Sequence, residues 1–341
     1  MANLSDNLLF WYKKNKRNLP WRRKKDLKNP YFVWLSEIML QQTTVAAAIN
    51  YYEKFINKWP SVEKLSEAKL DDVLFLWQGL GYYNRAINLH KCAKIISRDY
   101  NGKFPNSTKL LSKLPGIGEY TANAISSIAF NKKTIGIDVN VNRVVSRIFN
   151  LNINDKKGIK TSSLKILPQK KCGDFMQAIM DLGSTVCTKK KINCTVCPIL
   201  KYCNYTKSKN KNHVFRLVKK RNRKKFLYIY LIKCKNKIFF KKRIGSKLLN
   251  GLMEIPGSEW YDYKFTSNKA KDMAPVKLNW IKVPGILKYN ISNYKLEIRF
   301  LRAETKKEID IKYGRWLKKN RIKFLPISTL MKKVLDHLSL F

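Results

Sequence analysis

The sequence has no hydrophobic segment long enough to cross a membrane. Its first apolar run, in MANLSDNLLFWYKKNKR, holds only five consecutive apolar residues before charged residues follow. A transmembrane helix needs about 20 apolar residues, and the core of a secretory signal peptide needs about 7–15. These absences exclude both kinds of segment, so we expect a cytoplasmic protein with no membrane partner. Cysteines in the cytoplasm stay reduced and bind metals more often than they form disulfides.

Acidic residues are also scarce. The chain has 23 Asp and Glu against 70 Lys and Arg, which gives a formal net charge of +47. An excess of this size favours a polyanionic partner such as nucleic acid. However, most of the excess is Lys and is accompanied by many Asn and Ile residues, a composition that an AT-rich genome imposes on any protein. Both origins of the charge stay open.

The 341 residues divide into regions with different patterns and contain no internal repeat. Residues 1–206 carry apolar side chains at helical spacing, so they predict an all-helical domain. Residues 207–225 are basic and without periodicity, which indicates a linker. In residues 226–341, the segments 226–243 and 294–304 are rich in β-branched and aromatic residues and predict strands, whereas 325–341 predicts a helix. The fold class is therefore multidomain, α followed by α+β.

Cysteine is rare outside one short segment. Cys92, Cys172 and Cys234 are isolated and are expected to be ordinary buried thiols. The other four follow a C-x6-C-x2-C-x5-C pattern within CTKKKINCTVCPILKYC, at Cys187, Cys194, Cys197 and Cys203. Zinc sites usually use two short paired steps, whereas a [4Fe–4S] cluster accepts four cysteines at varied spacing. The spacing favours one [4Fe–4S] cluster and leaves structural zinc as the alternative.

A second motif, LSKLPGIGEYTANAISSIAF, predicts two helices joined by a glycine turn. The glycines Gly116 and Gly118 would let backbone N–H groups approach an anion at the positive end of the second helix. A plain helical hairpin with glycine caps is the alternative. In a basic protein with a cysteine cluster further along the chain, we favour binding of a phosphate.

Two carboxyl groups differ in their expected surroundings. Asp138 directly precedes a helical run, so we expect it to cap that helix and to stay ionised through backbone hydrogen bonds. Glu37 is flanked by apolar residues in VWLSEIMLQQT, which favours its protonated form, although a surface position on an amphipathic helix is the alternative. One acid and one anion are what cleavage of a glycosidic bond requires.

These motifs together resemble the helix-hairpin-helix DNA glycosylase superfamily and its iron–sulfur endonuclease III group. The segments LPWRRKKDLKNPYFVWLSEIMLQQT, LWQGLGYYNRAINLH, GKFP, LPGIGEYTA, MQAIMDLGSTVCT and GLMEIPG resemble the MutY-type adenine DNA glycosylase family along nearly the whole chain. The resemblance implies a monofunctional base-excision repair enzyme that removes adenine mispaired with 8-oxoguanine or guanine. It also implies duplex DNA as the partner, a monomer, a [4Fe–4S] cofactor and a place on the bacterial chromosome.

The resemblance also assigns roles to individual residues. Glu37 matches the acid that protonates adenine at N7, and Asp138 matches the carboxylate that stabilises the sugar cation. Tyr120 lies beside the sugar, and Asn140 helps to order the site. The segment that lines the adenine pocket matches Arg17, Leu19, Trp21 and Arg22. The wedges that enter the stack where the base leaves it match Gln42 and Tyr82. For Tyr82 and its neighbour Tyr83, aromatic core residues are the alternative.

The C-terminal region resembles the Nudix-like domain that this family uses to contact 8-oxoguanine. It lacks the Glu-rich catalytic box of Nudix hydrolases, so we do not expect this domain to hydrolyse nucleotides. The family's Phe-Ser-His loop corresponds to Ile291-Ser292-Asn293, so Ser292 is retained without its aromatic and imidazole neighbours. Two rival functions are a lyase of the endonuclease III type and a DNA-binding protein without catalysis. The lyase uses a lysine at the position of Tyr120, and Glu37 and Asp138 argue against the second rival.

Overall fold

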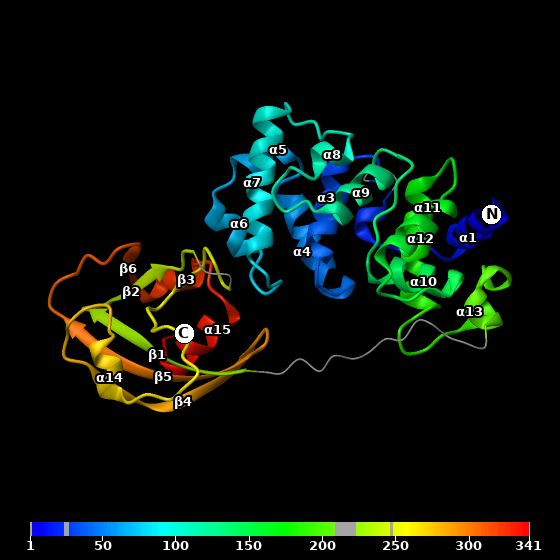
Figure 1. Cartoon of the computed structure of the whole chain (residues 1–341). Coiled ribbons are helices and arrows are strands. Elements are labelled where there is room, and N and C mark those ends of the chain that lie inside the picture. The colour runs from blue at the N-terminus through cyan, green and yellow to red at the C-terminus, as the bar shows by residue number, and fades with distance from the viewer. Residues whose placement is uncertain (1, 24–26, 209–222, 246–247, 341) are drawn as a thin grey trace. The chain divides into compact units, whose positions relative to one another are not determined.

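The computed structural model describes residues 2–23, 27–208, 223–245 and 248–340, and it divides into two compact units (Figure 1). The first unit is Met1–Glu67 with Asn88–Leu217, and the second is Ala68–Ile87 with Val218–Phe341. The sequence analysis placed residues 68–87 in the helical domain, whereas the structure groups this segment with the second unit. Most of the predicted linker, at 209–222, lies outside the described residues. Its last three residues begin strand β1.

The described residues of the first unit form helices and contain no named strand, as the sequence pattern predicted. Helix α7 begins in the second unit and continues into the first. The elements are α1 (Ala2–Asn15), η1 (Pro20–Arg22), α3 (Pro30–Leu40), α4 (Val45–Lys58), α5 (Val62–Glu67), α7 (Asn84–Asp99), α8 (Thr108–Leu111), α9 (Glu119–Ile128), α10 (Val139–Phe149), α11 (Lys156–Lys165), α12 (Cys172–Thr185), η2 (Cys194–Val196), η3 (Leu200–Tyr202) and α13 (Asn204–Lys207).

Helix α12 packs against α1, α9 and α10 in the first unit (Figure 1). Its residues Phe175, Met176, Ile179 and Leu182 are fully buried in one hydrophobic cluster with residues of these helices. Their spacing of three and four residues puts them on the buried side of α12. Burial of this apolar surface holds the helices that line the cavity described below.

Side-chain caps fix where several helices begin. Thr44 accepts a hydrogen bond from Ala47 N and caps α4, and Asp155 accepts one from Gly158 N and caps α11. Asn29 caps α3 in the same way, and Pro30 occupies its first position, where a missing N–H costs nothing. None of the described helices combines the length and the apolarity that crossing a bilayer requires.

The second unit is built on one six-stranded sheet of order β3-β2-β1-β5-β4, with β6 paired to β2. Strands β1 and β5 are parallel, and the other neighbouring pairs are antiparallel. The elements are α6 (Leu70–Leu76), β1 (Arg223–Cys234), β2 (Lys237–Lys242), β3 (Met253–Glu254), α14 (Ser267–Asp272), β4 (Ile281–Ile291), β5 (Tyr294–Thr305), β6 (Gly314–Lys318), η4 (Lys319–Phe324) and α15 (Thr329–His337).

Successive side chains of β1 are buried on opposite faces of the sheet. Leu227, Ile229 and Leu231 pack in the cluster that contains the buried residues of α15. The intervening Tyr228, Tyr230 and Ile232 pack in a second cluster that contains α14. Successive side chains of a strand point to opposite faces, so one strand contributes to both cores.

The strands predicted at 226–243 and 294–304 and the C-terminal helix are confirmed by β1, β2, β5 and α15. Strand β4 was missed because Pro284 and Gly285 interrupt its pattern. It lies at the edge of the sheet, where a missing backbone N–H is tolerated. Cys92, Cys172 and Cys234 are buried, as predicted.

The close approach of α12 to α10 generates the first testable prediction. A Cβ atom at Gly183 would lie 2.8 Å from Asn140 Cβ and 3.2 Å from its Cα, so an added methyl would push the helices apart. We expect Gly183→Ala to lower the free energy of unfolding by about 1–3 kcal/mol in a denaturant titration. Gly118→Ala is the matched control because no atom lies within 4 Å of its added Cβ. Equal stability of the two variants would contradict the close contact.

Candidate active site

A cavity of about 930 Å³ opens in the first unit. Its walls come from the chain before and within α3, the turn after α3, the start of α9, the start of α10 and the second half of α12. Nine residues singled out from the sequence line it: Arg17, Leu19, Trp21, Arg22, Glu37, Gln42, Tyr120, Asp138 and Asn140. The fold thus brings together side chains that are up to 123 positions apart between Arg17 and Asn140.

Glu37 lies on α3 with 6% of its surface exposed, so the alternative of a surface position is wrong. Tyr120 Oη donates a hydrogen bond of 2.8 Å to its Oε2. Burial raises the pKa of Glu37 to about 7; the hydrogen bond from Tyr120 and the charge of Arg22 oppose this rise, whereas the charge of Asp138 adds to it. A carboxyl with this pKa carries a proton in a large fraction of molecules at neutral pH.

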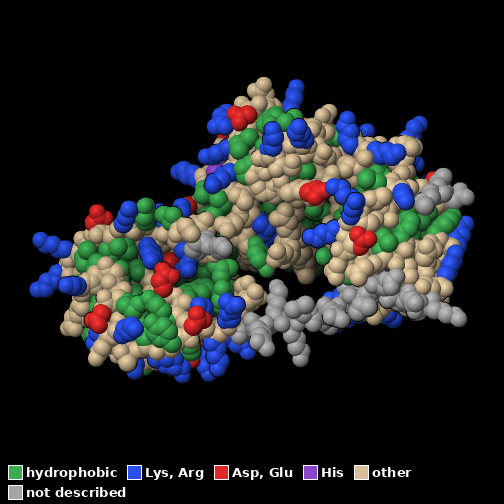
Figure 2. All heavy atoms as spheres, viewed as in Figure 1, with side chains coloured by type: hydrophobic (Ala, Val, Ile, Leu, Met, Phe, Trp, Pro, Cys, Tyr) green, Lys and Arg blue, Asp and Glu red, His purple; other side chains and the backbone are tan. Residues whose placement is uncertain are grey.

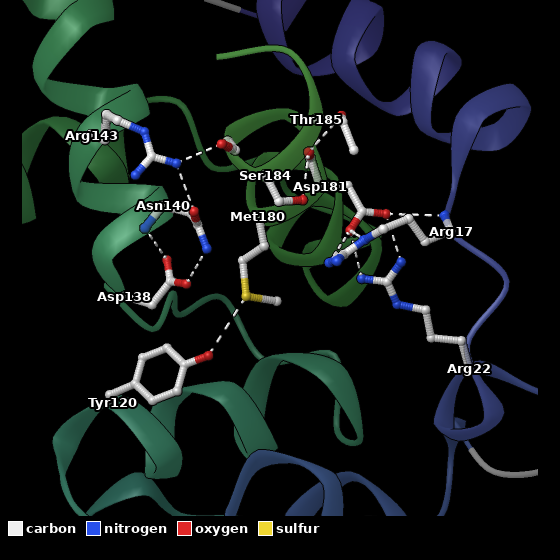
Figure 3. Close-up of polar contacts among 11 residues, drawn as sticks. Arg17, Arg22, Tyr120, Asp138, Asn140, Arg143, Met180, Asp181, Ser184 and Thr185 are labelled. Carbon is white, nitrogen blue, oxygen red and sulfur yellow. Dashed lines mark hydrogen bonds and ion pairs between the residues drawn. The ribbon is translucent and has the colours of Figure 1, made fainter. Parts of the chain in front are cut away.

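Tyr120 is the second residue of α9 and remains a phenol. Burial raises its pKa well above the usual value, and the charges of Glu37 and Asp138 raise it further. Its hydroxyl also lies 3.6 Å from Met180 Sδ on α12 (Figure 3). The ring is therefore fixed between α3 and α12 and can donate a proton in a hydrogen bond but does not ionise.

Asp138 caps α10, as predicted. Its Oδ1 accepts hydrogen bonds from Asn140 N at 2.9 Å and Val141 N at 2.7 Å. Its Oδ2 accepts a third from Asn140 Nδ2 at 2.8 Å (Figure 3). Three donors and the positive end of a helix dipole hold a negative charge in one place.

A further carboxylate, Asp181 on α12, was missed by the sequence analysis. Its side chain is 1% exposed and lies between two guanidinium groups (Figure 3). Arg17 Nε donates to Oδ1 at 2.6 Å, and Arg22 donates from Nη1 to Oδ2 at 2.6 Å and from Nη2 to Oδ1 at 3.0 Å. Asp181 therefore fixes two arginines of the cavity wall. Its signal was an acidic residue inside the apolar run MQAIMDLG.

Arg143 on α10 connects Asp138 to the cysteine loop. Its Nη2 donates to Asn140 Oδ1 at 2.6 Å (Figure 3), and its Nε donates to the carbonyl oxygen of Cys187 at 2.9 Å. One helical turn later, Arg147 Nη1 donates to the same carbonyl at 3.1 Å and to Cys187 Sγ at 3.1 Å. The sequence analysis named neither arginine, because only the fold places this turn of α10 against the loop.

The four clustered cysteines lie in one loop of the first unit and are each partly exposed. Burial raises the pKa of Cys197 to about 11, and the charges of Cys187, Cys203 and Cys194 raise it further, so the four thiols influence one another. Among the described residues, no group of three or more His, Cys, Asp or Glu side chains is arranged to hold a metal ion.

The neighbourhood of the cysteines nevertheless suits a cluster of negative charge. The buried cations Arg143 and Arg147 both contact Cys187. Burial and the charge of Arg147 lower the pKa of Arg143, whereas the charges of Cys187 and Asp138 raise it. A [4Fe–4S] cluster with four thiolates carries net negative charge and would offset the cost of burying both guanidinium groups.

The glycine turn before α9 has the predicted geometry. Gly116 has φ +77°, which favours glycine, and Gly118 is the N-cap of α9. Open space surrounds a Cβ built at Gly118, so a ligand can approach the backbone there. Lys and Arg side chains are scattered over much of the face shown in Figure 2 and do not gather in a single patch there.

Three of the residues assigned to DNA contact share a left-handed backbone. Gln42 has φ +55°, Tyr82 +48° and Ser292 +53°. Tyr82 and Ser292 belong to the second unit and are not among the residues that line the cavity. Tyr82 is 51% exposed whereas Tyr83 is buried, so the alternative of a core aromatic is right for Tyr83 and wrong for Tyr82. Ser292 begins the two-residue turn between β4 and β5.

Comparison with known proteins gives the same two-part architecture. Residues 35–169 match the HhH-GPD superfamily of base excision DNA repair proteins, and residues 227–337 match the NUDIX domain. Among solved structures, a thermostable thymine-DNA glycosylase is similar with a TM-score of 0.54 and 31% identity, over 60% of this chain and 94% of that chain.

Curated relatives from bacteria and from animals carry the name adenine DNA glycosylase. The protein of Homo sapiens is 42% identical over 208 residues, which cover 58% of this chain and 38% of that protein. The protein of Buchnera aphidicola subsp. Baizongia pistaciae is 42% identical over 245 residues, which cover 69% of this chain and 68% of that protein. With this identity over two thirds of a relative, and with both domains matched, the chain belongs to the adenine DNA glycosylase family.

Proposed function

We propose that this protein hydrolyses the N-glycosidic bond of adenine mispaired with 8-oxoguanine or guanine in duplex DNA, and that it acts as a monomer. The observation that carries the proposal is the pair of carboxyls in one cavity. Glu37 is buried with a pKa of about 7, whereas Asp138 is held by three hydrogen-bond donors. Two carboxyls in such different surroundings can serve as acid and anion in one reaction.

Glu37 is the acid. Its proton passes to N7 of the flipped adenine, which makes the base a better leaving group, and Tyr120 holds the carboxyl in place through its hydrogen bond. As the bond to the base breaks, positive charge develops on the sugar, and the fixed charge of Asp138 stabilises it. Water then bonds to the sugar carbon that the base has left, and the proton that this water loses returns to the Glu37 carboxylate. Asn140 orients Asp138 through its side-chain amide.

The adenine pocket is formed by the segment between α1 and α3. Leu19 and Trp21 are buried and supply an apolar wall, and Asp181 holds Arg17 and Arg22 in fixed positions. A fixed guanidinium costs little ordering entropy when a base arrives. Residues 24–26 of this segment lie outside the described residues.

Hydrolysis is favoured over the lyase reaction by the residues that line the cavity. A lyase of this superfamily needs an amine nucleophile, but in the described part of the chain no lysine lines the cavity. Tyr120 occupies the corresponding position and donates to Glu37. The proposed enzyme is therefore monofunctional.

The four cysteines of the loop hold one [4Fe–4S] cluster in this proposal. Binding of a cluster by these four cysteines would order the loop, and its Lys189, Lys190 and Lys191 would then face the DNA backbone. Arg143 and Arg147 balance its charge and connect the loop to α10. Gly116 and Gly118 bind a DNA phosphate at the start of α9.

Gln42 and Tyr82 act as wedges in this proposal, and Ser292 contacts the 8-oxoguanine. Gln42 and Tyr82 enter the base stack where adenine leaves it, which offsets part of the cost of base flipping. Ser292 offers 8-oxoguanine one hydrogen bond at the turn between β4 and β5. A typical hydrogen bond contributes about 0.5–1.5 kcal/mol, so Tyr82 and other contacts supply the remaining discrimination.

The proposal is tested first by removing the acid. Glu37→Gln should lower the single-turnover excision rate on a duplex with an A:8-oxoguanine pair by about 10²–10⁴-fold, because a positioned acid contributes that much. Binding to the same duplex should stay near wild type, since the side chain keeps its shape. The control Glu67→Gln changes a surface glutamate and should leave both quantities unchanged. Normal excision by Glu37→Gln would show that another group is the acid.

The raised pKa of Glu37 also predicts how stability depends on pH. The folded protein binds the proton more tightly than the unfolded chain, so the contribution of Glu37 is fullest below pH 4.5 and is lost as pH rises to about 7. Glu37→Gln does not ionise and should be more stable than wild type above pH 7, by up to roughly 3 kcal/mol. Urea titrations at several pH values measure the difference, and a constant difference from pH 4 to 9 would rule out a raised pKa.

Metal analysis tests the cluster. Anaerobically purified protein should be brown and contain about four irons per chain. Cys197→Ser should lose iron and absorbance, whereas the control Cys234→Ala changes a thiol of the second unit and should keep both. One zinc per chain without iron would contradict the cluster and favour structural zinc.

A further inference from the structure

The turn between α6 and α7 exposes one aromatic ring and buries two. Trp77 is fully buried and Tyr83 is 5% exposed, whereas Tyr82 between them is 51% exposed. Gly79, Gly81 and Tyr82 all have left-handed backbones, with φ of +96°, +75° and +48°. A tyrosine adopts this conformation at an energetic cost, so the surrounding contacts must impose it.

Arg85 supplies those contacts on both sides of Tyr82. Its Nη2 donates to the carbonyl of Leu80 at 3.0 Å and to that of Gly81 at 3.1 Å, and its backbone N donates to the carbonyl of Tyr82 at 2.9 Å. Trp77 Nε1 donates a second hydrogen bond to the Gly81 carbonyl, at 3.0 Å. The carbonyls that precede and follow the Tyr82 Cα are therefore both held, which restricts its backbone dihedrals.

The guanidinium also lies between two aromatic rings. Arg85 Cζ is 5.2 Å from the ring centroid of Trp77 and 5.7 Å from that of Tyr82. Arg85 is 9% exposed, and burial lowers its pKa to about 10, so the group is still a cation at neutral pH. The cation attracts the Tyr82 ring and leaves about half of that side chain open to a ligand.

We propose that Arg85 is a positioning residue that holds Tyr82 ready for insertion into the base stack beside the mispair. The inference rests on the proposed function, in which Tyr82 is a wedge. An aromatic ring that is ordered before DNA arrives loses little conformational entropy on insertion. Its stacking then offsets part of the unstacking that base flipping requires. Arg85 acts through Tyr82 and does not itself contact the substrate.

A double-mutant cycle tests the inference, because a residue that acts only through Tyr82 has no effect once Tyr82 is gone. Arg85→Met, Tyr82→Ala and the double variant are compared with the full-length, cluster-loaded protein. Single-turnover excision and the fluorescence of 2-aminopurine placed beside an A:8-oxoguanine pair are measured. We expect Arg85→Met to lower excision roughly tenfold and to reduce the fluorescence rise, as Tyr82→Ala does. In the Tyr82→Ala background, Arg85→Met should change neither quantity.

Two further variants keep the cycle decisive. Arg98→Met removes an exposed cation from the same helix and should leave excision unchanged, so a general charge effect is excluded. Arg85→Lys keeps the charge but not the planar pair of donors. Arg85→Lys should lower the excision rate less than Arg85→Met does. If Arg85→Met has a lower melting temperature than wild type, Arg85→Lys takes its place in the cycle.

The possible failures are separable. If Tyr82→Ala excises adenine and unstacks the duplex as wild type does, the wedge in the proposed function is wrong. If Tyr82→Ala is impaired but Arg85→Met is normal, or if the two losses multiply, only the positioning role of Arg85 is overturned.

Discussion

Burial of the Glu37 carboxyl is the constraint on which the candidate site depends. Helix α3 is apolar on nearly all sides, and most of its residues are buried, so its one acidic side chain is taken into the interior. Removal from water favours the protonated carboxyl, and Tyr120 from α9 supplies the hydrogen bond that makes this burial tolerable. Asp138, in the same cavity, has three donors and a helix N-terminus instead. Glu37 thus loses the solvation of water, whereas hydrogen-bond donors and a helix dipole of the protein solvate Asp138.

The buried charges around this pair are held by partners from α10 and α12. Asp181 contacts Arg17 and Arg22, and Arg143 links Asn140 to the backbone of the cysteine loop. A buried ion pair contributes little net stability, but it fixes the directions of its side chains. Asp181 lies on α12, and Arg143 also donates to the carbonyl oxygen of Gly183 on the same helix, so both sets of contacts connect to α12. Any shift between α10 and α12 would therefore move Asp138 and the cysteine loop together.

Three residues that the family resemblance assigns to DNA have a strained backbone, and they share this property with other described non-glycine residues such as Leu249 and Tyr313. Gln42, Tyr82 and Ser292 all have left-handed backbones, although glycine would adopt that conformation at lower cost. At Tyr82 the compensating contacts come from Arg85 and Trp77. A ring held in one direction by local contacts is ordered before any ligand arrives, at the expense of some stability of the turn.

The sequence by itself determined the helical first region, the main strands and C-terminal helix of the second, and the cap at Asp138, because periodicity and capping are local properties. The sequence also pointed to Glu37 as a candidate acid, to a metal cluster through the cysteine spacing, and to the family through its motifs. Only the tertiary structure decided that Glu37 is buried, that Tyr82 is exposed while Tyr83 is not, and that Asp181, Arg143 and Arg147 hold the site together. Strand β4 likewise depends on its neighbour β5. Burial, pKa shifts and ion pairs arise from contacts between residues far apart in the chain, so they follow from packing and not from any local pattern.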